Sequence, residues 1–285
     1  MTQSSTITAS PAQAIRHHYD TGNEFFRLWL DEDLNYSCAL FAPGDTLEAA
    51  QRRKVRYHIE RADAAGQRRV LDIGCGWGSV LEQLVTEHGV EHAVGLTLSD
   101  EQAKWIAGRH LPGVEARVES WTDHEAEEPY DSIICIGAFE HFTRQGLTPA
   151  EKAGRYRAFF SRCRSLLRPG RPMSLQTIAY GTMPAGQLSR FITSSIFPGG
   201  ELPRFAEIID SADGLFEVVS VANDRRDYAL TCREWARRLA ARRSEAVALV
   251  GEERVADFDR YLRMSAAGFE KGALVLLRFT FRSIE

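Results

Sequence analysis

A glycine-rich turn that follows a short apolar run constrains this chain more than any other stretch. Residues 70–78 read Val-Leu-Asp-Ile-Gly-Cys-Gly-Trp-Gly. Three glycines follow Asp72 at alternate positions: Gly74, Gly76 and Gly78. An apolar run that ends in glycines is typical of a buried strand, and the apolar residues behind the turn have helical spacing. Glycine permits the backbone angles of such a turn and a close approach by a ligand, while the helix N-terminus adds unpaired N–H groups.

A turn can need glycine for its backbone angles alone, but if the stretch is a nucleotide site, the spacing of the glycines distinguishes two classes of site. A dinucleotide site is expected to read G-x-G-x-x-G, with an acidic residue about 20 positions further on. This chain has G-x-G-x-G, and its next apolar run, 93–98, ends between Thr97 and Ser99 without a carboxylate. The pattern therefore disfavours a nicotinamide or flavin cofactor. It resembles instead the first motif of methyltransferases that use S-adenosylmethionine (SAM).

From residue 69 onward, strand-like and helix-like segments alternate. The expected strands are 69–73, 93–97, 132–136 and 171–178, and the expected helices are 79–88, 99–110 and 150–167. Such alternation predicts an α/β fold with a parallel sheet, which binds ligands at the carboxyl ends of its strands. Gly74, Thr97, Ile136 and Gln176 fall at or near these ends.

The segments on either side of this alternation have a different pattern. We expect helices at 11–31 and 46–65, capped by Ser10 and Thr46, with a loop at 35–41 and a solvated basic face at 52–54. After 178 we expect a loop or short-helix insertion at 179–205, helices over 231–270, and an antiparallel edge strand at 274–281. The expected organisation is one structural domain with an N-terminal helical lid (1–65), a core (66–178) and a substrate cap (179–285).

Composition excludes several classes of function. The net charge is −4, so no global basic field is available to attract nucleic acid. No apolar run approaches the roughly 18 residues of a membrane-spanning helix, and the N-terminus does not read as a signal peptide. The five cysteines are scattered without a C-x-x-C motif, which indicates a reducing cytoplasm and predicts neither disulfides nor a metal site.

Several further segments, in order and spacing, carry a specific resemblance. They are 18–26 (His-Tyr-Asp-Thr-Gly-Asn-Glu-Phe-Phe), 35–38 (Asn-Tyr-Ser-Cys), 95–102 (Gly-Leu-Thr-Leu-Ser-Asp-Glu-Gln), 136–142 (Ile-Gly-Ala-Phe-Glu-His-Phe) and 196–203 (Ile-Phe-Pro-Gly-Gly-Glu-Leu-Pro). Together with the glycine turn they resemble the cyclopropane-fatty-acid and mycolic-acid cyclopropane synthase family. The resemblance runs from about residue 15 to residue 281. It implies a Rossmann-like class I SAM methyltransferase fold with a mostly parallel seven-stranded sheet.

The resemblance also implies which residues hold SAM. The glycine turn with Asp72 would hold the methionine part. The ribose would fall to Thr97, Ser99 and Gln102, whose hydroxyl and amide groups can satisfy a diol without a carboxylate. The remaining candidates are an adenine-contacting pair, Trp121 and Thr122, and a lid pair, Tyr36 and Ser37.

The implied reaction transfers a methyl group to an unsaturated carbon. An alkene is a weak nucleophile and becomes a carbocation on attack, so the site must be dry, aligned and mildly electron-rich. Glu140, which follows the strand end at Ile136 among aromatic residues, is the first candidate to stabilise that charge. The alternatives for Glu140 are a helix-start position or a structural hydrogen bond to the N-terminal segment, and for the adjacent His141 we favour a structural role.

In the family a bicarbonate ion is thought to take a proton so that the ring closes. The matching positions are Cys38, Glu140, Gln176 and Tyr228, with Ile136 as a backbone contact. Gln176 stands where the family has a histidine, and a glutamine can neither carry charge nor move a proton. Ser265 stands where many members have a cysteine. Both departures weaken the expectation of bicarbonate binding and ring closure more than that of methyl transfer.

The expected substrate is an apolar small molecule or acyl chain, held by the Phe/Ile-rich insertion at 191–205 and the helices after 231. The product would be cyclopropane or methyl-branched. The alternative is a C- or N-methyltransferase that acts on a small prenyl, polyketide or alkaloid metabolite. A catalytically silent SAM-binding protein would be expected to lose the glycines or Glu140, and both are present. Homo-oligomerisation and transient membrane contact stay open.

Overall fold

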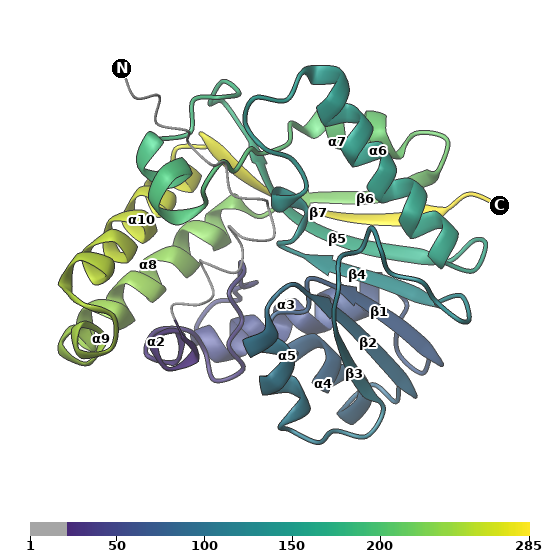
Figure 1. Cartoon of the computed structure of the whole chain (residues 1–285), viewed down its shortest axis with the longest axis horizontal. Coiled ribbons are helices and arrows are strands. Elements are labelled where there is room, and N and C mark those ends of the chain that lie inside the picture. Colours follow the sequence, from purple (N-terminus) through teal and green to yellow (C-terminus); the bar gives the residue numbers. More distant parts are fainter. Residues whose placement is uncertain (1–21) are drawn as a thin grey trace, which may run out of the picture.

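The computed structural model describes residues 22–285, and its centre is a seven-stranded sheet with the order β3-β2-β1-β4-β5-β7-β6. The strands are β1 (Arg69–Ile73), β2 (His92–Thr97), β3 (Val114–Val118), β4 (Ser132–Ile136), β5 (Pro172–Tyr180), β6 (Phe216–Asn223) and β7 (Leu274–Ser283). Strands β1 to β5 pair in parallel, whereas β7 is antiparallel to both β5 and β6 (Figure 1). This is the Rossmann-like α/β architecture that the sequence predicted.

Helices cover both faces of the sheet because successive strand residues point to opposite sides. On β1, Val70 packs with α3 (Leu47–Arg61), α4 (Ser79–Thr86) and α5 (Asp100–Ala107). Its neighbour Leu71 packs on the other side with α6 (Pro149–Leu166) and α7 (Phe205–Ala212). The apolar run of β1 is therefore buried on both faces, as a central parallel strand requires.

A third group of helices lies beyond the carboxyl ends of the parallel strands. It consists of α2 (Asn23–Arg27), α8 (Arg225–Ala241), α9 (Arg243–Val250) and α10 (Glu252–Glu270) (Figure 1). Aromatic side chains fill its core, and the rings of Trp29 and Trp235 meet edge to face at 5.8 Å. The helical group and the sheet together enclose the space in which the site lies.

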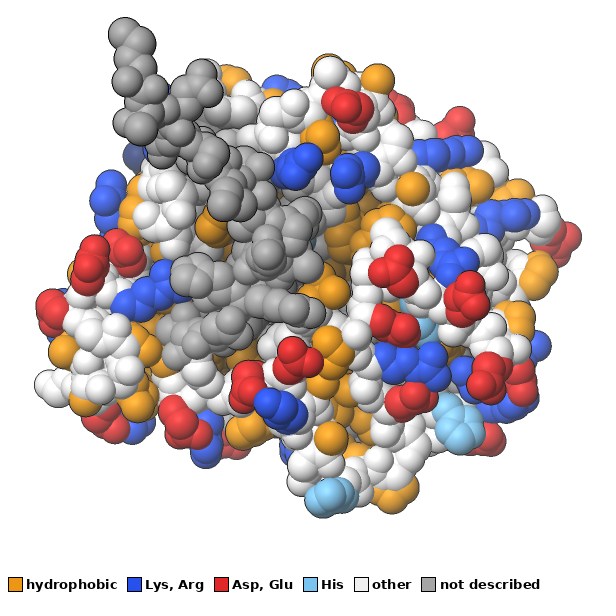
Figure 2. Space-filling view, in the orientation of Figure 1, with side chains coloured by type: hydrophobic (Ala, Val, Ile, Leu, Met, Phe, Trp, Pro, Cys, Tyr) orange, Lys and Arg blue, Asp and Glu red, His pale blue; other side chains and the backbone are white. Residues whose placement is uncertain are grey.

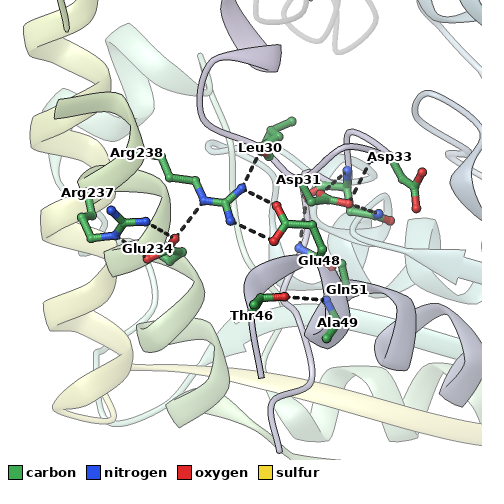
Figure 3. A network of polar contacts seen from close by, with 11 residues as sticks. Leu30, Asp31, Asp33, Thr46, Glu48, Ala49, Gln51, Glu234, Arg237 and Arg238 are labelled. Carbon is green, nitrogen blue, oxygen red and sulfur yellow. Dashed lines mark hydrogen bonds and ion pairs between the residues drawn. The ribbon is translucent and has the colours of Figure 1, made fainter. Parts of the chain in front are cut away.

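Arg238 ties this helical group to the first segment of the described chain. From α8 it donates two hydrogen bonds to Glu48 at the start of α3, of 2.7 and 3.1 Å, and one to the Leu30 carbonyl oxygen (Figure 3). Glu234, on the same helix, accepts from its Nε. A bidentate arginine–carboxylate pair fixes direction as well as distance, so α8 and the segment after α2 are held in one arrangement.

Most of the predicted elements are confirmed. The strands at 69–73 and 132–136 have the predicted bounds, and the other predicted strands and helices of the core differ by at most three residues at an end. Thr46 accepts a hydrogen bond from the Ala49 N–H and so caps α3 as expected. The helix start predicted at Ser10 and the motif residues 18–21 lie outside the described residues.

The structure differs from the predictions in three respects. Strand β7 is antiparallel as expected but lies between β5 and β6, so β6 and not β7 forms that edge of the sheet. Strands β6 and β3 were not predicted, because mostly exposed or half-buried residues leave them without a clear apolar pattern. The helical stretch begins earlier than predicted, at Arg225, and divides into three helices at Arg242 and Gly251. The φ of Gly251 is +83°, which suits glycine.

The surface in Figure 2 carries acidic and basic side chains interspersed, without one basic field on that face. Within residues 22–285, no helix is long and apolar enough to cross a membrane.

Candidate active site

A cavity of about 360 Å³ opens at the carboxyl ends of β1, β2 and β4. We call it the donor cavity. Among the residues predicted to bind SAM, those that line it are Tyr36, Ser37, Asp72, Gly74, Gly76, Thr97, Gln102, Trp121, Thr122 and Ile136. The structure therefore brings together residues from five separate segments of the sequence. Gly78 and Ser99 do not line it.

The glycine turn has two different steric requirements. At Gly74 φ is +81°, and an added Cβ would lie 2.5 Å from the Cβ of Ala138, so only glycine fits against the β4 loop. Gly78 precedes α4 with a φ of +87°, and its Cβ would lie 2.8 Å from Ile106 of α5. The third glycine of the motif thus serves helix packing rather than the cavity wall.

Asp72 is the fully buried acidic group in the wall of the donor cavity, which Glu119 also lines. It is buried, and its Oδ1 atom has no hydrogen-bond partner among the described residues. Burial raises its pKa to about 7, although the nearby Lys54 ammonium opposes the shift. A buried carboxylate oxygen without a partner in the cavity wall suits a cationic ligand. The donor cavity therefore fits SAM, which carries both an ammonium and a sulfonium group.

The end of β2 shows how the two hydroxyl candidates differ. Thr97 donates from Oγ1 to Gln102 Oε1 at 2.6 Å, and both side chains line the cavity. Ser99 accepts from the Gln102 N–H at 3.3 Å and so caps α5. Ser99 therefore positions Gln102 and does not itself form the cavity wall.

Lys54 is a residue of the donor cavity that the sequence analysis placed wrongly. It is buried on α3, lines the cavity, and donates to Asn35 Oδ1 at 2.9 Å and Ser37 Oγ at 3.1 Å. Burial lowers its pKa to about 8. The neighbouring Arg52 and Arg53 do reach the surface, so the predicted solvated face is wrong for Lys54 alone. The missed signal is the helical period, which places Lys54 on the same face as buried residues of α3.

A second cavity, of about 100 Å³, adjoins the first, and we call it the chamber. The predicted reaction residues that line it are Glu140, His141, Gln176 and Tyr228, and Ser265 lines it too. It shares four wall residues with the donor cavity: Tyr36, Ser37, Gly137 and His141. The other walls are mostly apolar and come from β5, β7, α10 and the segment around the π-helix η2 (Ile192–Ile196).

Glu140 presents a carboxylate to the chamber. It lies in the short helix η1 (Phe139–His141), which follows β4, and is 8% exposed. Its Oε1 accepts from the Ile178 N–H at 2.6 Å, whereas Oε2 has no partner among the described residues. Burial raises its pKa to about 7, although the Ile178 bond favours the ionised form. One oxygen therefore has a structural bond, to β5 rather than to the N-terminal segment, and the other is available to a ligand.

His141 and Tyr228 contribute rings rather than charges to the chamber. Burial lowers the pKa of His141 to about 4, so the ring is neutral, and it lies 5.5 Å from the Phe197 ring. Burial likewise raises the pKa of Tyr228 well above its usual value, and its ring stacks on Phe269 at 4.4 Å.

Cys38 lines neither cavity, although the resemblance implied a contact with the anion. Its thiol donates to the Ala39 carbonyl oxygen, and burial raises its pKa to about 12. Behind it lies Arg278 of β7, fully buried, which the sequence analysis missed. The only available signal was one arginine in the apolar run of 274–281.

Comparison with known proteins identifies the family of this chain. The family model described as mycolic acid cyclopropane synthetase matches residues 6–279. The chain belongs to this family. Cyclopropane mycolic acid synthase 2 of Mycobacterium bovis is 37% identical over 283 residues, covering 92% of this chain and 91% of that protein. Cyclopropane mycolic acid synthase 1 of Mycobacterium tuberculosis is 34% identical and covers 93% and 95% of the two chains.

Solved structures lead to the same family. The cyclopropane synthase MmaA2 of Mycobacterium tuberculosis superimposes with a TM-score of 0.86 at 30% identity, covering 98% of this chain and all of the other. The mycolic acid cyclopropane synthase CmaA1, complexed with SAH and CTAB, gives 0.86 at 33% identity, over 95% and 98% of the chains. As a mycolic acid cyclopropane synthetase family member, the chain is a SAM-dependent methyltransferase. Coclaurine N-methyltransferase, at 22% identity and a TM-score of 0.75, shares the fold.

Proposed function

We propose that this methyltransferase transfers the methyl group of SAM to a carbon–carbon double bond of an unsaturated, lipid-like chain. The observation that carries the proposal is the unpartnered Glu140 oxygen in an apolar chamber that adjoins the donor cavity. Two relatives that cover more than 90% of this chain are cyclopropane mycolic acid synthases, and the CmaA1 structure is a complex with SAH and the detergent CTAB. The product would be a cyclopropane or a methyl branch.

The residues of the donor cavity have distinct roles in this proposal. Asp72 would pair with the donor's ammonium, the turn at Gly74 and Gly76 would let its methionine part approach the main chain, and Thr97 with Gln102 would bind its ribose. Trp121 and Thr122 would contact its adenine, and Tyr36 with Ser37 would close over it. When bound, SAM supplies an electrophilic methyl group on a positively charged sulfur.

The chamber residues would act on the substrate. Apolar walls exclude water, which strengthens the field of any charge inside. The Glu140 carboxylate would stabilise the positive charge that develops on the alkene carbon. Gln176 and Tyr228 of the chamber, with the backbone at Ile136 of the adjoining donor cavity, would hold bicarbonate, which would supply a base. Because Gln176 is uncharged, we propose weaker anion binding than a histidinium would give.

Three parts of the chain have different roles in this proposal. We propose that residues 1–65 act as a lid, 66–178 as the donor-binding core and 179–285 as the substrate cap within one domain. All five cysteines are free and buried, which supports a reducing, cytoplasmic location.

N-methylation of a small amine is the second candidate. Two buried carboxylates, Glu140 and Glu201, lie in the chamber wall, and a protonated amine would be attracted to them. A chamber of about 100 Å³ is also small for a long chain unless the chain extends beyond it.

The two candidates make different products from the same donor. We expect label from SAM with a radioactive methyl group to enter unsaturated phospholipid, and not saturated phospholipid, soluble alkenes or amines. Mass spectrometry should show a gain of 14 mass units, and NMR of the product should distinguish a ring from a methyl-alkene. Label in amines alone would replace the proposal by N-methylation.

The raised pKa of Glu140 predicts a pH dependence. A carboxyl group with a pKa of about 7 is mostly neutral below pH 7 and ionised above it. Since the ionised form is needed, kcat/KM for SAM, which reports the free enzyme, should rise as the pH increases through about 7 and then level off. Asp72 titrates in the same range, so the profile should be measured in Glu140→Gln and Asp72→Asn as well. A flat wild-type profile from pH 6 to 8 would contradict the assignment.

A further inference from the structure

The side chain of Gln176 is held from behind the chamber by two nitrogen groups. Arg278 Nε donates to Gln176 Oε1 at 2.9 Å, and His58 Nε2 lies 3.2 Å from the same oxygen. Gln176 is only 1% exposed, yet it lines the chamber. Because the guanidinium can only donate, this end of the amide must be the oxygen. The N–H₂ end then faces the opposite way, toward the chamber.

His58 supports the same orientation. It is fully buried, and burial together with the charges of Arg278 and Lys54 holds its pKa well below its ordinary value. The ring is therefore neutral and has one N–H. Its Nδ1 lies 2.8 Å from Ser174 Oγ, whose hydroxyl can donate to it. The N–H is then on Nε2 and points at the Gln176 oxygen.

The other nitrogens of Arg278 hold neighbouring parts of the site. Nη1 forms an ion pair with the carboxylate of Asp224, which lies directly before α8. The backbone carbonyl oxygen of Asp224 accepts from the Tyr228 N–H one turn on, at 3.2 Å. Nη2 donates to the carbonyl oxygens of Cys38 and Ala39, at 3.2 and 3.1 Å. One buried guanidinium thus connects the amide of β5, the start of α8 and the segment that continues from the lid pair.

We propose that Arg278 is a positioning residue for methyl transfer: it fixes the Gln176 amide so that its N–H₂ group, and not its oxygen, faces the chamber. The inference rests on the proposed function, because the chamber is taken as the place of reaction. The fixed amide donates to an oxygen acceptor on the substrate or on a small oxyanion beside it. A flipped amide would turn its oxygen toward the chamber, where the Glu140 carboxylate already lies. Neither group could then donate a hydrogen bond to an oxygen acceptor on the substrate or on an oxyanion.

The orientation can be tested without turnover. In protein labelled with ¹⁵N at glutamine side chains, Gln176→Leu assigns the Gln176 N–H₂ signals. We expect Arg278→Met to shift these signals, and Arg282→Met, which removes an exposed arginine from the same strand, to leave them unchanged. Gln51, which donates to the Ser37 carbonyl oxygen at 2.9 Å, is the internal control for general disturbance. Because Arg278→Met leaves Asp224 without its partner, the pair Arg278→Met/Asp224→Asn is measured too.

A double-mutant cycle then tests the link to the reaction. We expect Arg278→Met and Gln176→Leu each to lower kcat on the order of 10²-fold, as misplacement of a positioning group does, with SAM affinity changed less than about threefold. If Arg278 acts through Gln176, adding Arg278→Met to Gln176→Leu should lower kcat by no more than about twofold further.

The outcomes separate this inference from the proposed function. Unmoved Gln176 signals in Arg278→Met, or losses in kcat that multiply in the double variant, would overturn the role of Arg278. Should wild-type protein transfer no methyl group to any alkene while Gln176 still responds to Arg278, the proposed function fails and the orienting role stands.

Discussion

Replacement of Glu140 by Gln is expected to abolish most methyl transfer while leaving SAM binding intact. The variant keeps the size of the side chain and an acceptor for the Ile178 N–H, but removes the negative charge beside the developing carbocation. Loss of one preorganised electrostatic contact in a dry site lowers turnover on the order of 10²- to 10³-fold. The measurement is kcat by single-turnover transfer of labelled methyl, together with the SAM dissociation constant from calorimetry.

Glu201→Gln provides the matched control for this experiment. Glu201 lines the same chamber, but its carboxylate lies 3.8 Å from Lys152 Nζ, so its charge is already partly compensated. We expect its loss to lower kcat less than tenfold, on the scale of one partly screened charge. Full turnover in Glu140→Gln, or equal losses of kcat in both variants, would show that the Glu140 carboxylate does not specifically stabilise the developing carbocation.

Gly74→Ala is expected to weaken SAM binding more than any other single methyl group added to the glycine turn. The added Cβ would lie 2.5 Å from Ala138 Cβ, and the backbone has a φ of +81°. A positive φ costs a non-glycine residue roughly 1–2 kcal/mol. The contact must also displace Ala138, which directly precedes η1 and so lies two positions before Glu140. We expect at least a 10²-fold rise in the SAM dissociation constant, measured by calorimetry.

Two variants separate the clash from the backbone strain. Gly89→Ala introduces a methyl group at a φ of +65° with no atom within 4 Å, and should leave SAM affinity unchanged. Adding Ala138→Gly to Gly74→Ala removes the opposing methyl group and should restore part of the affinity. If Gly74→Ala binds SAM as the wild type does, the turn is not the donor site.

Features that depend on neighbouring residues in the sequence could be predicted from it. The strand ends at Asp72, Thr97, Ile136 and Gln176 could be predicted from apolar runs, and the parallel topology then places these ends at one edge of the sheet. Helix caps such as Thr46 were predictable for the same reason, because capping depends on residues three positions apart.

The partners of buried charges were not predictable, because they come from distant parts of the chain. The helical period places Lys54 on the buried face of α3, but only the fold shows that its partners are Asn35 and Ser37. Arg278 is stabilised by groups on three other segments, the farthest of which is 240 positions away in sequence. The resemblance likewise identified Cys38 and Ser99 but not their surroundings, since a matching residue type does not fix which way a side chain points.

The donor cavity and the chamber are built from different parts of the chain, which has a consequence for engineering substrate selectivity. The donor cavity is built mainly from the first half of the described chain, whereas residues 188–202, α8 and α10 contribute most of the chamber, and only four residues belong to both. Grafting residues 188–202 from a relative should therefore alter which molecules are accepted while leaving cofactor recognition in place. Such chimaeras would allow the substrate range to be changed one segment at a time while the SAM-binding half of the protein stays the same.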